Sequence, residues 1–365
     1  MKYSVTAGAV AIFFLAATAS AAEGPSSRQK EWEKTVAAAQ TEGTVVLGGP
    51  APPAYREGLG VFQKVFPKIK MEFAPASGRD FAPRILAERR AAKFLWDVHI
   101  GGAGTPNAML KPEGVLDPLM QALILPEVLD NNAWSGGFAD GWMDREERFI
   151  YAFSGRVTPQ VYVNWDVVSK RELTKVEDLL DPKWKGKISW NEPRAQGSGG
   201  AVAGYWYYLF GEEFFRKFLK QDIVPVRDLR QQVEWVVRNR YPIAIGPDDT
   251  FLKVFQDQGV GLNIKPFAFD TLAGGGRIGP GFGSIMLVNR APHPNAARVF
   301  INWVLSHDGQ AAYTKASEIN SRRLDVREGP PETQPKKGVK YFNINKEVNN
   351  HYQLKAIEIA KEILK

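Results

Sequence analysis

The sequence has 365 residues, of which 44% are apolar and 24% are charged. This length is too great for one small core and fits two globular lobes. The absence of cysteine excludes disulfides, thiol nucleophiles, iron–sulfur clusters and cysteine-ligated zinc, and four histidines leave little room for a multi-histidine metal site. The surplus of seven positive charges is modest and does not by itself identify an anionic partner.

The N-terminal segment has the three parts of a secretory signal. Lys2 gives a short basic start, residues 5–19 are almost wholly apolar, and Ala19-Ser20-Ala21 ends the segment with small residues at the spacing typical of a cleavage site. The apolar stretch is too short to span a bilayer. We therefore expect a signal peptide at residues 1–21 and export of the mature chain to the periplasm.

After this segment, helices alternate with short buried strands. The spacing of apolar residues predicts helices over residues 31–42, 55–66 and 81–93 and strands over residues 44–48, 70–74 and 97–100. Glycines follow the first and third strands, as in strand-to-helix turns. This order indicates a sheet with parallel strands built from crossover units.

The second half of the chain repeats the pattern. It predicts strands over residues 149–153, 160–164, 187–190 and 241–246, with helices over 201–210, 214–219 and 229–238. A strand-like stretch at 278–289 precedes helices at 295–305, 309–315 and 348–365. We therefore predict an α/β fold of two similar lobes rather than one large sheet.

Motifs of catalysis and cofactor binding are poorly represented. Ser198 and Ser284 lack the preceding glycine of the G-x-S-x-G nucleophile elbow. Residues 274–279 fit G-x-G-x-x-G, but Pro280-Gly281 follows, so no helix can begin where a dinucleotide motif requires one. Basic pairs such as Arg89-Arg90 are flanked by acids or isolated, unlike a nucleic-acid-binding stripe. We expect no catalytic residue, no cofactor, no metal and no nucleic-acid partner.

Three strand-to-helix turns have the composition of anion sites, because a helix N-terminus presents free N–H groups and the positive end of its dipole. They are Ser77-Gly78-Arg79, the turn from Gly101 to Thr105 that includes Gly102, and Gly197-Ser198-Gly199. The alternative for each turn is an ordinary N-cap.

Two arginines accompany these turns. Arg194 precedes the third turn and would add a bidentate grip on a carboxylate or phosphonate, and Arg156 lies between two strands that we expect to connect the lobes. The alternative for both is a surface ion pair. We place Arg156 in the cleft.

Two further features point to the same cleft. Asp248 and Asp249 follow a strand, where they would face a cationic or hydroxylated ligand or cap a helix beginning at Thr250. Four aromatic residues stand together at 205–208. Most of them are expected to pack inside the second lobe, and at least one to reach the cleft.

Three stretches carry a family resemblance. They are Ala87-Glu88-Arg89 with Asp97-Val98; residues 184–188 with 191–194 and 211–213; and residues 291–297 with 300–306 and Gly309-Gln310. In these stretches the chain resembles the periplasmic solute-binding proteins of ABC importers, in the branch that includes the ferric-iron binders. The likeness spans nearly the whole mature chain.

The resemblance implies a type 2 periplasmic-binding-protein fold, in which each lobe is a mixed sheet flanked by helices and a small-molecule solute binds in the hinged cleft. The first lobe would comprise residues 30–153 plus 275–365 and the second lobe residues 154–274. The partner would be the transmembrane permease subunits of an ABC importer, and we expect a monomer.

The sequence departs from the ferric binders at their metal site. Those proteins hold iron with an adjacent tyrosine pair after the strand that corresponds to residues 241–246, where this chain has Pro247-Asp248-Asp249. Tyr207-Tyr208 lie on an earlier predicted helix. Because iron(III) prefers phenolate oxygens, we expect instead a small organic anion such as a carboxylate or phosphonate. Ferric iron with a rearranged ligand set, and an exported enzyme on the same scaffold, remain alternatives.

Overall fold

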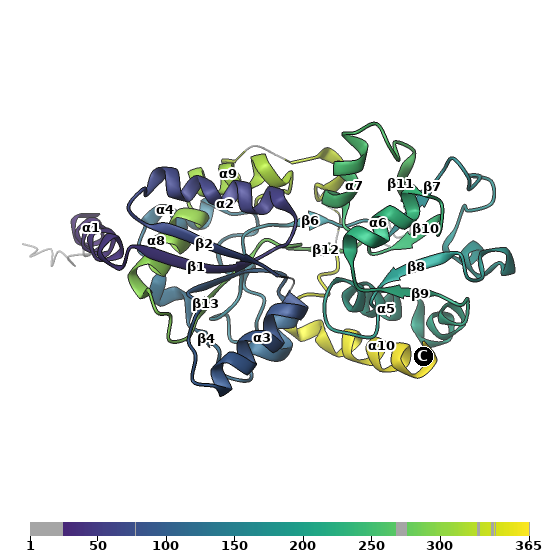
Figure 1. The fold of residues 1–365 in the computed structure, drawn as a ribbon, viewed down its shortest axis with the longest axis horizontal. Helices are drawn as coiled ribbons and strands as arrows, with labels where there is room; N and C mark the ends of the chain where they lie inside the picture. Colours follow the sequence, from purple (N-terminus) through teal and green to yellow (C-terminus); the bar gives the residue numbers. More distant parts are fainter. Residues whose placement is uncertain are drawn as a thin grey trace, which may run out of the picture.

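The structure, a computed structural model, describes residues 25–76, 78–267, 276–326, 329–336, 339 and 341–364. Two β-sheets lie side by side, each flanked by helices, so that the chain forms two lobes (Figure 1). The mixed α/β, two-lobed fold expected from the sequence is confirmed. The predicted signal peptide at residues 1–21 lies outside the described residues.

The first lobe is built on strands in the order β2-β1-β3-β13-β4, with β5 also paired to β13. Strand β1 is parallel to β2 and β3, whereas β13 is antiparallel to β3, β4 and β5. The strands are β1 (Thr44–Gly49), β2 (Lys70–Pro75), β3 (Val98–Gly101), β4 (Leu116–Asp117), β5 (Tyr151–Ala152) and β13 (Ser284–Val288). Because β13 is distant in sequence, this sheet is completed only after the chain returns from the second lobe.

Helices cover this sheet and close its core. They are α1 (Pro25–Glu42), α2 (Pro53–Val65), α3 (Gly78–Arg90), α4 (Pro126–Leu129), α8 (Pro294–Leu305) and α9 (His307–Ser317). Phe62 of α2 packs its ring 5.1 Å from Phe300 and 5.4 Å from Trp303 of α8. Such aromatic contacts add to the burial of apolar area and fix α2 against α8.

The second lobe has a sheet in the order β11-β7-β10-β8-β9. Strand β8 is parallel to β9 and β10, and β7 is antiparallel to β10 and β11. The strands are β7 (Val161–Asn164), β8 (Ile188–Asn191), β9 (Val224–Val226), β10 (Ile243–Ile245) and β11 (Ile264–Phe267), and the helices are α5 (Ser198–Leu219), α6 (Leu229–Val237) and α7 (Asp249–Gln256). The sheet therefore brings the ends of β8 and β10, and the helices that follow them, to one edge.

Helix α5 combines two predicted helices. Its backbone is non-helical at Gly211, whose φ is 77°, a region that glycine adopts without steric cost. On either side of this kink, Trp206 and Phe218 are fully buried and pack against Trp190 of β8. None of the aromatic residues 205–208 lines the pocket between the lobes described below, so the expectation that one reaches the cleft is wrong.

A short ribbon connects the lobes. Strand β6 (Arg156–Val157) pairs antiparallel with β12 (Ile278–Gly279), and Figure 1 shows the two strands between the sheets. The chain thus leaves the first lobe through β6 and returns through β12. These two crossings place residues of the ribbon next to any ligand held between the lobes.

The C-terminal helix α10 (Asn350–Ile363) lies against the second lobe, alongside α5 (Figure 1). Its residues Ala356, Ile359 and Ala360 are buried in the same apolar core as Trp206 and Phe218. The expected boundary, which assigns residues 275–365 to the first lobe, therefore fails at this helix. The amphipathic pattern predicts the helix but does not identify the lobe that receives its apolar face.

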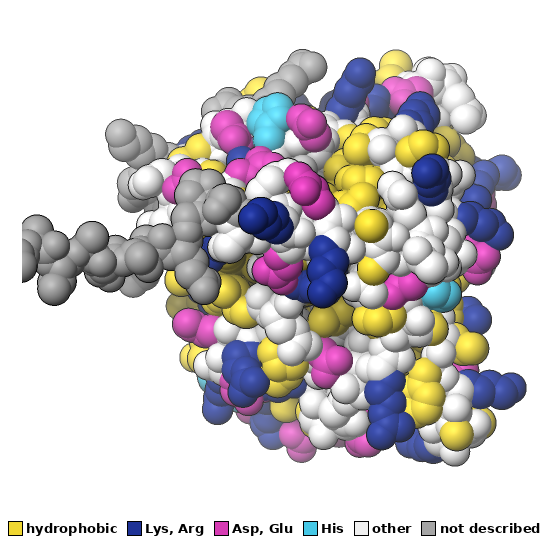
Figure 2. Space-filling view, turned by 90° about the vertical axis from the view of Figure 1, so that its left-hand side faces the viewer, with side chains coloured by type: hydrophobic (Ala, Val, Ile, Leu, Met, Phe, Trp, Pro, Cys, Tyr) yellow, Lys and Arg dark blue, Asp and Glu magenta, His cyan; other side chains and the backbone are white. Residues whose placement is uncertain are grey.

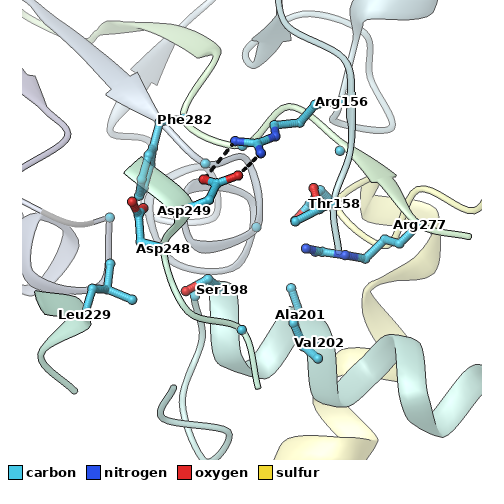
Figure 3. A pocket seen from close by; sticks show the side chains of 18 of the residues that line it. Arg156, Thr158, Ser198, Ala201, Val202, Leu229, Asp248, Asp249, Arg277 and Phe282 are labelled. Atoms are coloured by element: carbon cyan, nitrogen blue, oxygen red, sulfur yellow. Dashed lines mark hydrogen bonds and ion pairs between the residues drawn. The ribbon is translucent and has the colours of Figure 1, made fainter. Parts of the chain in front are cut away.

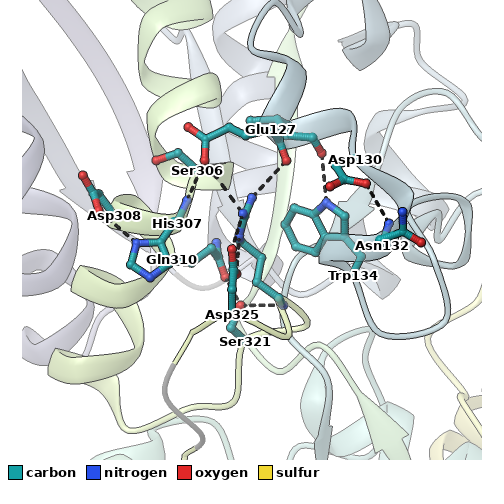
Figure 4. A network of polar contacts seen from close by, with 12 residues as sticks. Glu127, Asp130, Asn132, Trp134, Ser306, His307, Asp308, Gln310, Ser321 and Asp325 are labelled. Carbon is teal, nitrogen blue, oxygen red and sulfur yellow. Dashed lines mark hydrogen bonds and ion pairs between the residues drawn. The ribbon is translucent and has the colours of Figure 1, made fainter.

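A buried arginine fixes the chain after α9 to the first lobe. Arg323 donates to the carbonyl oxygens of Glu127 and Leu305, both at 3.2 Å, and to both carboxylate oxygens of Asp325 at 2.9 and 2.7 Å. Its guanidinium also lies over the ring of Trp134, 5.4 Å from the centroid. Figure 4 shows this network of polar contacts, which anchors the segment leading toward the C-terminal helix.

The charged surface at the end of the first lobe is mixed. In Figure 2, basic and acidic side chains are interspersed over this face. Several are paired, as Arg84 is with Glu88 and Arg298 with Glu31. On this face, positive side chains are therefore interspersed with negative ones rather than gathered into one patch.

Candidate functional site

A pocket of about 150 Å³ lies between the lobes beside the connecting ribbon (Figure 3). Its lining comes from the first lobe (Tyr55, Gly78, Gly102, Thr105), the second lobe (Ser198, Asp248, Asp249) and the ribbon (Arg156, Arg277, Gly279). Clefts between domains are common positions for small-molecule sites, whose volumes usually run from about 300 to 1,000 Å³. This smaller cavity fits a small solute.

Arg156 of β6 forms an ion pair with Asp249 of α7. Arg156 Nη1 donates to Asp249 Oδ1 at 3.2 Å, and Nη2 donates to Oδ2. Burial favours the neutral guanidine, but the charge and hydrogen bonds of Asp249 outweigh it and hold the pKa of Arg156 above its ordinary value. Arg156 thus lines the pocket as a cation whose charge is balanced by the second lobe.

Asp248 caps α7, the second of the two roles considered from the sequence. Its Oδ1 accepts from the backbone N–H groups of Thr250 at 2.9 Å and Phe251 at 3.1 Å. Burial and the neighbouring charge of Asp249 raise the pKa of Asp248 to about 6. The carboxyl group therefore both orders the helix and lines the pocket in a form that changes charge near neutrality.

Tyr55 reaches the same helix from the first lobe. Its hydroxyl lies 3.4 Å from Thr250 Oγ1, and its ring packs edge-on against Phe282 at 5.3 Å. Burial raises the pKa of the Tyr55 phenol well above its ordinary value. The side chain is consequently a neutral phenol that joins the two lobes beside the pocket.

Arg277 supplies the second positive charge. It forms a β-bridge with Phe342 immediately before β12 and is 7% exposed. Figure 3 shows its guanidinium pointing into the pocket beside Thr158. Among the described residues, the two carboxylates that line the pocket are engaged, since Asp249 pairs with Arg156 and Asp248 accepts from backbone amides.

The start of α5 forms the floor of the pocket on the side of the second lobe. Ser198 Oγ donates to Asn191 Oδ1 at 2.8 Å, and the N–H of Gly199 donates to the same oxygen at 3.1 Å. A Cβ on Gly199 would lie 1.6 Å from the carbonyl oxygen of Asn191. Ser198 lines the pocket, whereas Gly199 is needed for the close approach of α5 to β8 and lies behind it, contrary to the sequence prediction.

Arg194 does not reach the pocket. Its guanidinium donates to both carboxylate oxygens of Glu192, at 2.8 and 3.0 Å, and to the carbonyl oxygen of Leu364 at 3.2 Å. These hydrogen bonds hold the pKa of Glu192 below its usual range. The predicted grip on a solute is therefore replaced by a structural ion pair, the alternative considered from the sequence.

The turns of the first lobe come together at the pocket. Gly78, Gly102 and Thr105 all line it, and a Cβ on Gly78 would lie 3.5 Å from Thr105 Cβ. Ser77 lies outside the described residues, as does the side chain of Arg79. Thr105 precedes a π-helical turn at Pro106–Leu110, which carries the chain away from the pocket.

Among the pocket-lining residues that sequence reasoning missed are Tyr55, Thr158, Arg277 and Phe282. Tyr55 lies in the first turn of α2, directly after a strand-to-helix turn like those that were selected. Arg277 lies inside the glycine-rich segment 274–279, which the sequence only excluded as a dinucleotide motif. Phe282 and Thr158 carry no local signal, because their place depends on the return of the ribbon.

Comparison with known families identifies the chain. The family model of the bacterial extracellular solute-binding proteins matches residues 35–311, which is most of the sequence. The chain belongs to this family. It is the solute-binding component of a bacterial ABC importer, and the family resemblance seen in the sequence is confirmed.

Solved structures with the same fold include several binding proteins. The Trichodesmium protein IdiA (FutA), in complex with iron and citrate, is 18% identical with a TM-score of 0.65, and the match covers 88% of this chain and 99% of that one. The ferric binding protein from Campylobacter jejuni is 15% identical with a TM-score of 0.67, covering 88% and 99%. AfuA from Actinobacillus pleuropneumoniae, with fructose-6-phosphate bound, is 18% identical with a TM-score of 0.64, covering 88% and 98%. A search of curated proteins found no significant match.

In the part of the chain that the structure describes, no three or more His, Asp or Glu side chains are grouped so that they could hold a metal ion. Tyr207 packs on the core of the second lobe, and Tyr208 stacks on Phe342 with ring centroids 3.9 Å apart. Within the described ranges, none of the helices is both long and apolar enough to cross a membrane.

Proposed function

We propose that this solute-binding protein captures a small organic anion, a carboxylate or phosphonate, between its two lobes and delivers it to the transmembrane permease subunits of its importer. The observation that carries the proposal is the direction of the charges. Arg277 points into the pocket, while Asp249 is neutralised by Arg156 and Asp248 is held by the amides of α7. A solute in the pocket therefore faces hydrogen-bond donors and positive charge.

The binding residues that we propose are those that the structure brings together: Gly78, Gly102, Thr105, Arg156, Arg277, Ser198 and Asp248. Charge-assisted hydrogen bonds from Arg277 would hold the anionic group, since a guanidinium matches the planar geometry of a carboxylate. The N-terminus of α5 at Ser198 adds the positive end of a helix dipole on the same side. The raised pKa of Asp248 means that its negative charge, which opposes an anion, is reduced as the pH falls toward about 6.

Ferric iron is the second candidate, because several proteins of the same fold bind it by their descriptions. The donor set argues against it here. Tyr55 is kept as a neutral phenol by burial, and both carboxylates are already engaged. Iron(III) bound to phenolate would give a visible charge-transfer band, so a protein that stays colourless when ferric citrate is added would exclude this ligand set.

An exported enzyme on this scaffold is the third class. Covalent catalysis needs a nucleophile beside a base. Ser198, the serine of the pocket, donates instead to the amide oxygen of Asn191. We therefore propose binding without turnover, by a monomer that works in the periplasm.

A thermal-shift panel tests the proposal. Binding of an anion at a hundred times its Kd stabilises the folded state by about 2.7 kcal/mol, which raises the Tm by several degrees. We expect a shift with a subset of small carboxylates or phosphonates in the wild type, none in Arg277→Gln, and an unchanged shift in Arg171→Gln, whose side chain is exposed in the second lobe. An unchanged Tm across the whole anion panel would refute the proposal.

A further inference from the structure

The C-terminal segment, residues 341–364, lies beyond the part of the chain that the family model matches, residues 35–311. Two of its residues contact the first lobe. Glu347 accepts from the backbone N–H of Arg145 at 2.8 Å and from Lys111 Nζ at 2.6 Å, and Lys346 Nζ donates to Asp140 at 3.0 Å. These contacts hold residues 346–347 on the first lobe, whereas Phe342 stacks on Tyr208 of the second lobe.

The same segment then binds the second lobe. Helix α10 packs so closely on α5 that a Cβ on Gly204 would lie 2.6 Å from the Cα of Gln353. Arg216 of α5 donates to both carboxylate oxygens of Glu362, each at 3.0 Å. The segment, yellow in Figure 1, thus contacts both lobes.

One side-chain amide of this segment lines the pocket, and a second lies next to its lining. Asn345 lines it. Gln353 is not among the lining residues, but a Cβ on Gly104, which lines the pocket, would lie 3.6 Å from Gln353 Oε1 and 3.9 Å from Asn345 Oδ1. Gln353 is 1% exposed, and its Nε2 donates to the carbonyl oxygen of Gly197 at 3.5 Å. Its Oε1 is buried without a hydrogen-bond partner among the described residues.

We propose that the C-terminal segment forms a polar wall of the solute pocket, in which Asn345 and Gln353 recognise a hydroxyl group of the bound anion. The proposal rests on the function proposed above and narrows the solute to a hydroxy-substituted small anion. A buried acceptor without a partner costs free energy that a ligand donor recovers. Gln353 Oε1, oriented by the contact of its own amide with Gly197, offers such an acceptor.

The donor that fits this wall is a hydroxyl rather than an ammonium group. An ammonium group taken out of water needs a nearby free carboxylate. The carboxylates of the pocket are committed to Arg156 and to the amides of α7. A neutral hydroxyl can donate to Gln353 Oε1 without adding charge, while the anionic group of the solute faces Arg277.

Matched ligand pairs test this inference. Malate against succinate, and glycerol 3-phosphate against propyl phosphate, differ in hydroxyl groups while keeping the anionic group, and the two pairs separate a carboxylate solute from a phosphate solute. Affinities are measured by titration calorimetry for the wild type, Asn345→Ala and Gln353→Met. Lys355→Ala is the control, since the Lys355 side chain on α10 is 43% exposed and pairs with Glu358.

We expect the wild type to bind the hydroxylated member of one pair about fivefold to tenfold more tightly, as one net hydrogen bond provides. Asn345→Ala and Gln353→Met should reduce that ratio toward one, and Lys355→Ala should keep it. Asn345 is only partly buried, so Asn345→Ala should fold normally. It therefore still tests the inference if Gln353→Met lowers the stability of the protein.

Three results would overturn the inference, and they are distinguishable. If the wild type binds both members of a pair equally, or if Asn345→Ala and a folded Gln353→Met keep the full preference, the polar wall is refuted and the anion site stands. If the wild type binds no anion, including those of the thermal-shift panel, the proposed function fails and the inference fails with it. Preference for an amino-substituted analogue such as aspartate would refute recognition of a hydroxyl.

Discussion

The ion pair between Arg156 and Asp249 provides a test in which stability and affinity change in opposite directions. In Asp249→Asn, Arg156 keeps its place but loses the carboxylate that balances its charge. Breaking a buried ion pair costs about 3–5 kcal/mol. Because the Asp249 side chain is 32% exposed, water screens part of this, and we expect a loss of about 1–3 kcal/mol of unfolding free energy.

The same substitution should strengthen anion binding. A unit charge about 6 Å away at an effective dielectric constant of about 20 contributes about 2.8 kcal/mol, so removing the negative charge of Asp249 favours an anion in the pocket by up to that amount. Loss of this charge also lowers the pKa of Asp248, which Asp249 now helps to raise, and the ionised carboxylate offsets part of the gain. We expect a Kd about tenfold lower than in the wild type.

Urea unfolding of the unliganded protein and titration calorimetry with a bound anion measure the two effects. Asp257→Asn is the matched control, because Asp257 lies at the end of the same helix, pairs with exposed Lys253 and is remote from the pocket. The assignment of the pocket to anions would be refuted if Asp249→Asn bound the anion more weakly than the wild type. It would also be refuted if the wild type bound a cation more tightly than an anion and the variant lost that binding.

Three further predictions follow from single contacts. Because Asp248 has a pKa of about 6, anion affinity should fall as the pH rises through that value. Asp248→Asn, which retains a capping side chain, should flatten the calorimetric pH profile for a ligand of constant charge. The contribution of the raised pKa to folding stability is present below the ordinary carboxyl pKa and is lost as the pH rises through about 6. Gly199→Ala should lower the unfolding free energy by about 2–4 kcal/mol, since its Cβ would clash with the carbonyl of Asn191, and a change below about 1 kcal/mol in urea unfolding would contradict the packing described. Arg323→Met should cost about 2–4 kcal/mol in the same assay, because it leaves buried carbonyl oxygens without donors, whereas a neutral result would show that the network in Figure 4 does not anchor the chain.

The periodicity of apolar residues was sufficient to predict the alternation of strands and helices. A helix buried on one face and a fully buried strand each leave a characteristic spacing of apolar residues over a short stretch of sequence. The turns after β2, β3 and β8 were selected as anion sites because helix N-termini present free N–H groups. Gly102, Thr105 and Ser198 were selected on this basis and line the same pocket.

The partners of charged side chains were not predictable in the same way. Arg194 was assigned to the cleft although Glu192, two residues before it, holds its guanidinium. Arg156 lies in the pocket, but its pairing with Asp249 joins residues 93 apart in sequence. The Arg156–Asp249 pair depends on how the lobes are placed against each other, which no local pattern contains.

The C-terminal helix illustrates the same limit for packing. Its amphipathic pattern predicts the helix but not the lobe on which it packs. The close fit of Gly200 and Gly204 of α5 against Gln353 and Ile357 of α10 places it on the second lobe. Glycines in a helix interior usually lower its stability. Here they permit the contact that brings Gln353 beside the pocket.

Native mass spectrometry of the protein freshly isolated from a periplasmic extract measures the central claim most directly. The account predicts a complex with one small organic anion per chain, released on unfolding and absent from Arg277→Gln. Co-purification of ferric iron or of a cationic solute in the same pocket would contradict it.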